Sequence, residues 1–257
     1  MIINRALIAG AGLITGLLMQ INVHAQDSEP NKWAPANISI DGQATEWPKP
    51  LQFYNNETKL FYTIANDKDT LYVIVSVPDP QSQFKIMRSG LTFSINPSGK
   101  KKVGASLTFP LTTNATPAPD VPEESQQRVA EEWKKKILAN VKEIKVDGFT
   151  GIDNGKIPVA NKYGIRTASS FDAAGNLICE MAIPLSVAGI PAGSDKPVAY
   201  RFKVNALNKE DRKPRDPKAG QQDPNAAQGQ GGANDPRMMS LMYFSTDFWT
   251  KQTLATH

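Results

Sequence analysis

The feature that most constrains this chain is a set of short segments in which apolar and polar residues alternate. The segment YRFKVNA, at 200–206, alternates aromatic or aliphatic residues with Arg201, a lysine and Asn205. GLTFSIN at 90–96 alternates in the same way, and LYVIVSV at 71–77 has an aliphatic residue at every second position from Leu71 to Val77, which gives it one wholly aliphatic face. A period of two residues is typical of a β-strand with one buried face. The chain is therefore expected to consist mainly of strands.

Other segments extend this pattern along the chain. LFYTIA, KEIKVDGF, LICEMAI and SLMYFST also have strand-like composition, and NDKD, NPSG, DAAGN and PAGSD supply turns between strands. No strand–helix repeat runs through the sequence, so a parallel sheet covered by helices is not expected. The sequence predicts an all-β fold, an antiparallel β-sandwich of the jelly-roll or immunoglobulin-like kind.

Two segments depart from the strand pattern. Residues 121–142 carry acidic residues early, lysines later and an apolar residue at every fourth position from Val129 to Val141, including Trp133. This spacing predicts an inserted α-helix that packs on the sandwich through Trp133. Residues 208–237 are rich in Gly, Gln, Pro and charge, which predicts a long flexible loop. The alternative for this loop is a flap over a binding face.

The N-terminus has the three-part pattern of a secretory signal peptide. Arg5 precedes an apolar stretch, and the sequence VHA ends at Ala25, before a predicted cut. The apolar stretch is shorter than the ~20 residues of a membrane helix, and an uncleaved anchor is the alternative. We expect an exported protein, periplasmic, outer-surface or secreted, with a signal peptide at 1–25. The mature chain at 26–257 is expected to be a single sandwich domain without a membrane span.

Histidine and cysteine limit the chemistry that the mature chain can perform. The two histidines are His24, inside the predicted signal peptide, and His257, the last residue. Ser-His-Asp catalysis and the usual zinc sites need an internal histidine and are therefore excluded. The single cysteine, Cys179, cannot form an intrachain disulfide and is expected to be a buried strand residue. Carboxylate chemistry, as in glycosidases, stays open, but no spacing identifies a catalytic pair, and we expect no enzyme.

The charge pattern does not indicate a nucleic-acid partner. The net charge is +4, and KEDRKPRDPK alternates in sign instead of forming a basic stripe. Aromatic and basic residues are not interleaved as in nucleic-acid grooves. Non-specific attraction to acidic envelope polymers is the electrostatic partner class that remains.

Four segments follow one another along the chain: ISIDGQATEW, FYTIANDKDTLYVIVSVPD, NLICEMAIPLSVAGI and VAYRFKVNAL. In this order they resemble the family 9 carbohydrate-binding modules and their DOMON-like relatives. The likeness covers most of residues 37–207, with the helix and the flexible stretch as insertions, and rests on the order and spacing of the segments. The resemblance implies a β-sandwich and sugar binding, in some members with structural calcium. A haem-binding DOMON-like domain is a weaker alternative, because Met238 and Met239 have no internal histidine to complement them.

Candidate ligand residues follow from how proteins bind sugars. A pyranose ring lays its apolar face on an aromatic side chain, and polar groups fix its hydroxyls. The candidates are Trp249, Phe248, Asp79, Arg201, Asn205 and Trp33. For each of them, terminal packing or a solvated strand face is the alternative. Trp47, in IDGQATEWPKP, is expected to be a core residue and not a sugar platform.

Asp67 and Asp69, in NDKD, are candidate ligands for Ca²⁺, because hard cations bind several oxygens. An ordinary Asp-rich turn is the alternative. No other cofactor is expected.

Two classes of function remain. The first is an exported, non-catalytic domain that binds a glycan. The second is a structural or protein-interaction sandwich of the cell envelope that has no sugar site. A likeness of fold alone does not identify a ligand.

Overall fold

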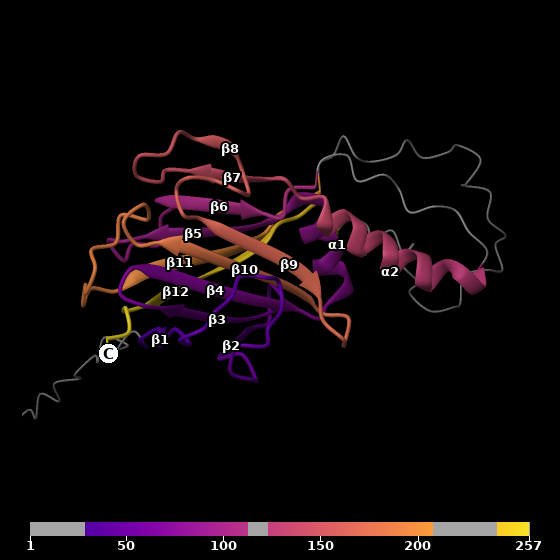
Figure 1. Cartoon of the computed structure of the whole chain (residues 1–257), viewed down its shortest axis with the longest axis horizontal. Coiled ribbons are helices and arrows are strands. Elements are labelled where there is room, and N and C mark those ends of the chain that lie inside the picture. Colours follow the sequence, from indigo (N-terminus) through magenta and orange to yellow (C-terminus); the bar gives the residue numbers. More distant parts are fainter. Residues whose placement is uncertain (1–28, 113–122, 208–240, 257) are drawn as a thin grey trace, which may run out of the picture.

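The strands form two stacked sheets (Figure 1). The computed structural model describes residues 29–112, 123–207 and 241–256, without side chains at 123–128. The strands are β1 (Lys32–Trp33), β2 (Phe53–Asn55), β3 (Leu60–Asn66), β4 (Thr70–Val77), β5 (Leu91–Asn96), β6 (Ala105–Phe109), β7 (Glu143–Asp147), β8 (Gly155–Pro158), β9 (Arg166–Phe171), β10 (Leu177–Pro184), β11 (Val198–Val204) and β12 (Thr246–Gln252). The predicted all-β sandwich is confirmed.

The order of the strands defines the two sheets. The first sheet has the order β1-β3-β4-β10-β9, with β2 also paired to β3, and the second has the order β12-β11-β5-β6-β7-β8. Neighbouring strands are antiparallel, except that β1 and β3 are parallel. Along each strand of the second sheet, successive side chains point alternately into the sandwich and away from it, because this is the geometry of a β-strand.

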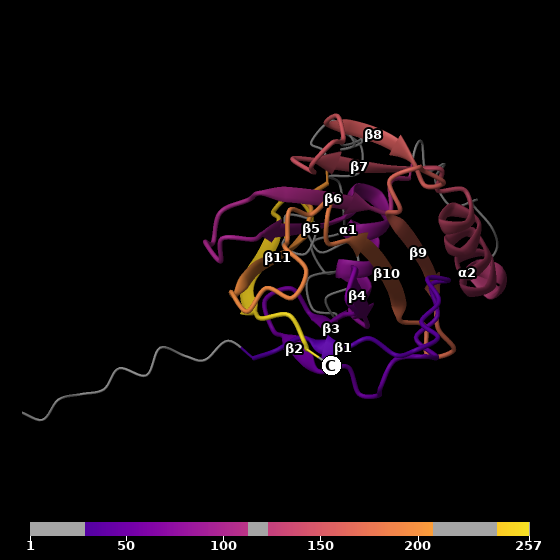
Figure 2. The ribbon, with the colours of Figure 1, turned by 60° about the vertical axis from the view of Figure 1, so that its left-hand side comes forward.

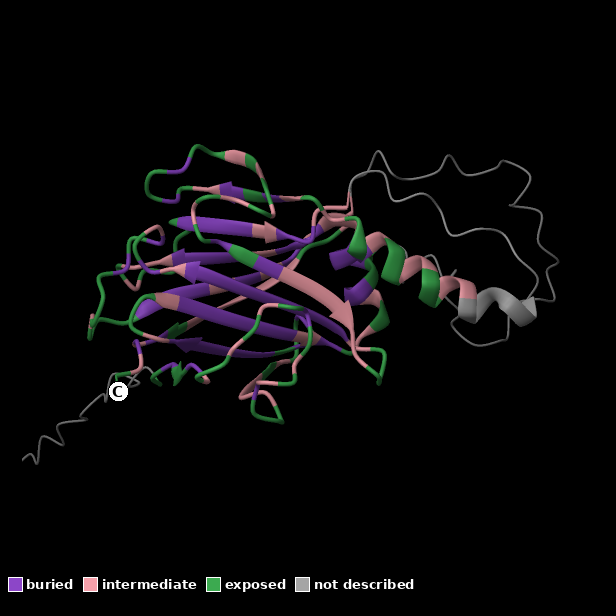
Figure 3. Ribbon diagram, viewed as in Figure 1, coloured by how far each residue is buried: buried purple, intermediate pink, exposed green. Residues whose placement is uncertain are grey.

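The main core lies between the two sheets, where buried residues concentrate on the facing strands (Figure 3). The alternation in β5 and β11 places Phe93, Tyr200 and Phe202 inside, fully buried. The ring of Phe93 lies 5.7 Å from that of Tyr200 and 5.0 Å from that of Phe202, centroid to centroid. Cys179 is buried in the same core, as predicted, and burial raises the pKa of its thiol to about 12. This thiol is therefore uncharged and unreactive at neutral pH.

Both helices lie at the ends or edges of the sandwich. The helix α2 (Glu123–Ala139) falls within the predicted 121–142 and packs on the core through Trp133 and Ile137, as the apolar stripe predicted. It contacts β9, beside which it lies in Figure 2. The helix α1 (Pro80–Ser89) was not predicted. It contacts β4 and β11.

The last strand differs from the prediction. SLMYFST, at 240–246, was expected to be a strand, but β12 begins only at Thr246. The apolar run LMYF at 241–244 gave a stronger strand signal than TDFWTKQ, the sequence of β12, in which most residues are polar. The predicted signal peptide at 1–25 and the predicted flexible loop at 208–237 lie outside the described residues. Within those residues, no helix has the length and apolar character needed to span a membrane.

The outer face of the first sheet is covered by residues 34–51, which we call the cover segment. Outward side chains of the first sheet, Tyr72, Ile74, Ile178 and Ala182, form a second apolar cluster with Trp47 of the cover segment. Trp47 is only 3% exposed, which confirms its predicted place in a core. The cover segment contains no helix or strand. Its residues Ile38 and Ile40 pack against the sheet.

A buried carboxylate fixes the cover segment to the sheet. Glu180, on the outer face of β10, is 0% exposed. It accepts hydrogen bonds from the indole Nε1 of Trp47 at 2.6 Å and from the backbone nitrogens of Gly42 at 2.8 Å and Asp41 at 3.1 Å. Burial raises the pKa of Glu180, and the three hydrogen bonds act against that rise. The IDG and EW parts of the sequence thus meet at one side chain.

The turn that faces Glu180 requires a glycine. Gly42 has a φ of +84°, which side-chain-bearing residues rarely adopt. A Cβ at this position would lie 2.8 Å from the backbone carbon of Ser169 on β9. The close approach of the cover segment to the sheet therefore depends on the missing side chain.

The Trp47–Glu180 contact should be visible as a coupling energy. Trp47→Phe keeps an aromatic ring but removes the indole donor, and should lower the free energy of unfolding by about 1.5–3 kcal/mol. We expect Trp47→Phe and Glu180→Gln together to cost at least ~1 kcal/mol less than the sum of the two single changes, because they share one interaction. Urea unfolding of the four proteins measures this difference. Strictly additive costs would show that the two side chains do not depend on each other.

Candidate functional site

Three of the six predicted ligand residues come together on the outer face of the second sheet. Because Tyr200 and Phe202 point into the core, Arg201 points outward from β11, and Asn205 follows at the end of that strand. On β12, Trp249 points outward. The register pairs Trp249 directly with Arg201. The strand alternation that builds the core therefore also assembles this face.

An ion pair fixes Arg201 beside the indole ring. Its guanidinium Nε donates to the carboxylate Oδ2 of Asp247 at 2.8 Å, and its guanidinium carbon lies 5.8 Å from the centroid of the Trp249 ring. This Arg201 hydrogen bond holds the pKa of Asp247 below its ordinary value. The Arg201 and Asp247 side chains are 24% and 30% exposed, so both can still reach a ligand. A planar cation and an aromatic ring are thus held next to one another.

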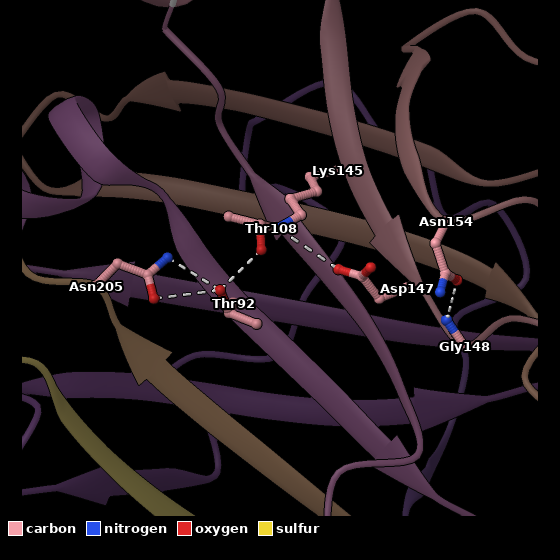
Figure 4. Close-up of polar contacts among 7 residues, drawn as sticks. All are labelled: Thr92, Thr108, Lys145, Asp147, Gly148, Asn154 and Asn205. Carbon is pink, nitrogen blue, oxygen red and sulfur yellow. Dashed lines mark hydrogen bonds and ion pairs between the residues drawn. The ribbon is translucent and has the colours of Figure 1, made fainter.

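A band of hydroxyl and amide groups runs from Asn205, after β11, across β5 and β6 (Figure 4). The Thr92 and Thr108 hydroxyl oxygens lie 2.8 Å apart on neighbouring strands. The Asn205 amide nitrogen lies 2.9 Å from the Thr92 hydroxyl and 2.9 Å from the carbonyl oxygen of Ser89. These three side chains are half-buried. They offer donors and acceptors of the kind that sugar hydroxyls use.

The far end of the face, on β7 and β8, is electrostatically balanced. Lys145 is 3.7 Å from the Asp147 carboxylate, and Lys156 is 3.5 Å from Glu143. Beside them, the Asn154 side chain accepts a hydrogen bond from the Gly148 nitrogen at 2.8 Å, which holds the turn between β7 and β8 (Figure 4). The cations at this end therefore already have carboxylate partners.

The other three predicted ligand residues lie elsewhere. Phe248 points into the sandwich, where its ring centroid is 5.1 Å from that of Phe202 and 5.2 Å from that of Tyr62. Asp79 is the N-cap of α1, and its carboxylate accepts from the Ser82 nitrogen at 2.8 Å. Trp33 is 39% exposed but belongs to β1 of the first sheet. Phe248 is thus a core residue and Asp79 a capping residue in this fold.

Asp67 and Asp69, the candidate calcium ligands, lie in a hydrogen-bonded turn. Both Asp67 carboxylate oxygens already accept hydrogen bonds, one from the Asp69 and Thr70 nitrogens and the other from the Tyr72 hydroxyl. The Asp69 side chain is 70% exposed and lies 3.4 Å from the Lys68 amine. Within the described residues, no group of three or more acidic, His or Cys side chains is placed to hold a metal ion. The contacts are those of the Asp-rich turn that the sequence left as the alternative.

Sequence reasoning missed several side chains of this face: Asp247, Lys203, Lys251, Thr92 and Thr108. Asp247 was not considered because the last strand was predicted at 240–246, which ends before it, so the polar face of β12 was not recognised. The alternation in GLTFSIN was the signal for Thr92, which it places on the polar face of its strand. Which strands are neighbours in the second sheet could not be read from the sequence.

The Arg201–Asp247 pair should contribute little stability, with a defined pH dependence. Asp247→Asn should lower the free energy of unfolding by up to about 1 kcal/mol at pH 7, because the pair is near the surface. Since the pKa of folded Asp247 is depressed, this contribution should be complete above about pH 4 and lost as the pH falls through that lowered pKa. Urea unfolding from neutral to acidic pH tests this, with Asp147→Asn, from a longer and more exposed pair, as the matched control. A cost that persists unchanged at acidic pH would contradict it.

No protein-family model matches the chain, and no curated protein matches it significantly. The function must therefore be argued from the residues themselves.

Proposed function

We propose that this protein is an exported, non-catalytic carbohydrate-binding domain, and that its glycan lies on the outer face of the second sheet at Trp249. The observation that carries the proposal is the direct cross-strand pairing of Trp249 with Arg201. An aromatic ring beside a fixed donor is the minimum arrangement that a sugar site needs. The resemblance to family 9 carbohydrate-binding modules supports the same class of ligand.

The neighbouring groups suit a sugar bound on this face. The apolar face of a pyranose would stack on the Trp249 indole, and its hydroxyls would accept from Arg201 and donate to Asp247. Thr92, Thr108 and Asn205 continue the polar surface toward the middle of the sheet. Because β-strands hold these side chains, the ligand would meet a pre-ordered surface and little loop ordering would oppose binding.

The arrangement of carboxylates supports binding without catalysis. Asp247 on β12 and Asp147 on β7 lie on strands separated by three others, β11, β5 and β6. At ~4.8 Å per strand this separation is about 19 Å, too far for the acid and base of a glycosidase, which work within ~10 Å. Both carboxylates also form ion pairs. They are therefore suited to hold cations and not to transfer protons to a substrate.

The outer face of the first sheet is used differently. Over β4 and β10 it is covered by the cover segment, which buries Trp47 almost completely, whereas the rings of Tyr54 on β2 and Phe61 on β3 are exposed. An aromatic platform must be accessible, so Trp47 is not proposed to touch a ligand. The proposal therefore assigns the two outer faces different roles, one in stability and one in binding.

A glycan-array screen of residues 26–257 tests the proposal. We expect saturable binding to at least one glycan class, weakened about tenfold or more by Trp249→Ala, because loss of stacking should cost on the order of 1.4 kcal/mol. Trp33→Ala, at an exposed tryptophan of the first sheet, is the matched control and should leave binding unchanged.

The remaining outcomes separate the alternatives. If binding survives Trp249→Ala, the protein binds glycans at another site. If the folded protein binds no glycan on the array, the carbohydrate proposal is wrong. A structural or protein-interaction sandwich is then the better description.

A further inference from the structure

We propose that the glycan is anionic, a polysaccharide with carboxylate-bearing sugar units. This inference rests on the proposed function and names the chemical class of its ligand. Its basis is the distribution of charge around Trp249, which differs from that on the rest of the same sheet face. Cations cluster on three sides of the indole, and only one carboxylate lies among them.

The register of β11 and β12 fixes this cluster. Arg201 lies directly opposite Trp249, and Lys203 lies diagonally from it, opposite Asp247. Lys251 follows Trp249 by two residues on β12 and so shares its face. Opposite residues have Cβ atoms ~5 Å apart and diagonal ones ~7–8 Å apart, so all three cations can reach a ligand stacked on the indole.

The charges of this cluster do not cancel. Asp247 is engaged by Arg201 at 2.8 Å. In the part of the chain that the structure describes, neither Lys203 nor Lys251 forms an ion pair. Lys203 also interacts electrostatically with Asp247, so the cluster holds three cations around one carboxylate and keeps a net positive charge next to Trp249.

The opposite end of the same face, on β7 and β8, does not have this excess of positive charge. There, Lys145 and Lys156 are each within 4 Å of a carboxylate, those of Asp147 and Glu143. On the described strands of this sheet, the two lysines outside an ion pair are those that flank Trp249, its one outward-facing tryptophan. The hydroxyls of a neutral sugar could accept hydrogen bonds from these amines, but a carboxylate would add an ion pair with each of them.

The spacing of the two lysines also suggests how the polymer lies. Lys203 and Lys251 are on opposite sides of the Arg201–Trp249 pair along the strand direction. They are separated by four residue steps in register, about 13 Å at the rise of a strand. A sugar on Trp249 with an acidic unit on each side would place one carboxylate near each lysine. The glycan chain is therefore expected to run parallel to β12.

Oligogalacturonate and its methyl ester are matched probes, because esterification removes the charge and keeps the sugar backbone. Calorimetric titration of residues 26–257 should show the acid binding at least about tenfold more tightly than the ester, and the preference should shrink as salt rises from ~0.05 M to ~0.5 M. Lys203→Gln and Lys251→Gln should each reduce the preference by about threefold or more. Lys145→Gln removes a cation of the same face that is already paired, and should leave the preference unchanged.

The possible failures of the two proposals can be told apart. If the ester or a neutral cello-oligosaccharide binds as well as the acid, or if only neutral glycans bind on the array, the anionic inference is overturned and the carbohydrate-binding function stands. If poly-glutamate binds as tightly as the acidic sugar, the surface recognises charge and not a glycan, which also overturns the inference. If a folded protein binds no glycan at all, the proposed function fails, and the inference fails with it.

Discussion

The carboxylate of Glu180 is the group on which the arrangement of this molecule most depends. A buried carboxylate is costly unless hydrogen bonds compensate for the water it has lost. Here the compensation comes from an indole and two backbone nitrogens, all supplied by the cover segment. The segment has no regular secondary structure, so few backbone interactions hold it in place. One side chain of β10 thus fixes an irregular segment against the sheet, and Trp47 adds apolar packing to these hydrogen bonds.

This constraint makes the two outer faces unequal. The first sheet has apolar side chains on both faces because the cover segment buries the outer one, whereas the second sheet keeps a polar outer face.

A second set of contacts fixes the strand that carries Trp249. Asn66 accepts from the Ala255 nitrogen at 2.8 Å and from the Asn31 amide at 3.1 Å, which joins the chain just after β12 to the segment just before β1. The proposed binding face therefore rests on a strand held at its end by buried hydrogen bonds.

Much of the second sheet could be predicted because its strands are buried on one face and alternate accordingly. YRFKVNA and GLTFSIN gave the correct inner faces for this reason. The helix α1 was missed because its apolar residues do not form a regular stripe: Phe84 is 40% exposed and Lys85 is buried. Its one clear signal was Asp79 followed by proline, an N-cap before a first helical residue, which was instead considered as a ligand.

The site was predictable only in parts. Arg201, Asn205 and Trp249 were each recognised by residue type, but their meeting depends on the pairing of β11 with β12, which no local pattern reveals. The partner of Trp47 was hidden for the same reason, since Glu180 is 133 positions away in the sequence. Conversely, Phe248 was considered beside Trp249 because the two are adjacent, and strand geometry sends adjacent residues to opposite faces.

The most direct test of these unequal faces is a nuclear magnetic resonance titration that follows the indole signals of the protein's four tryptophans. On adding oligogalacturonate, the Trp249 indole signal should shift progressively, while that of Trp47 stays in place and exchanges slowly with deuterated solvent. Such a result would show that one face binds while the other is sealed by Glu180. A Trp47 signal that moves with ligand or exchanges rapidly, with Trp249 unaffected, would contradict the account.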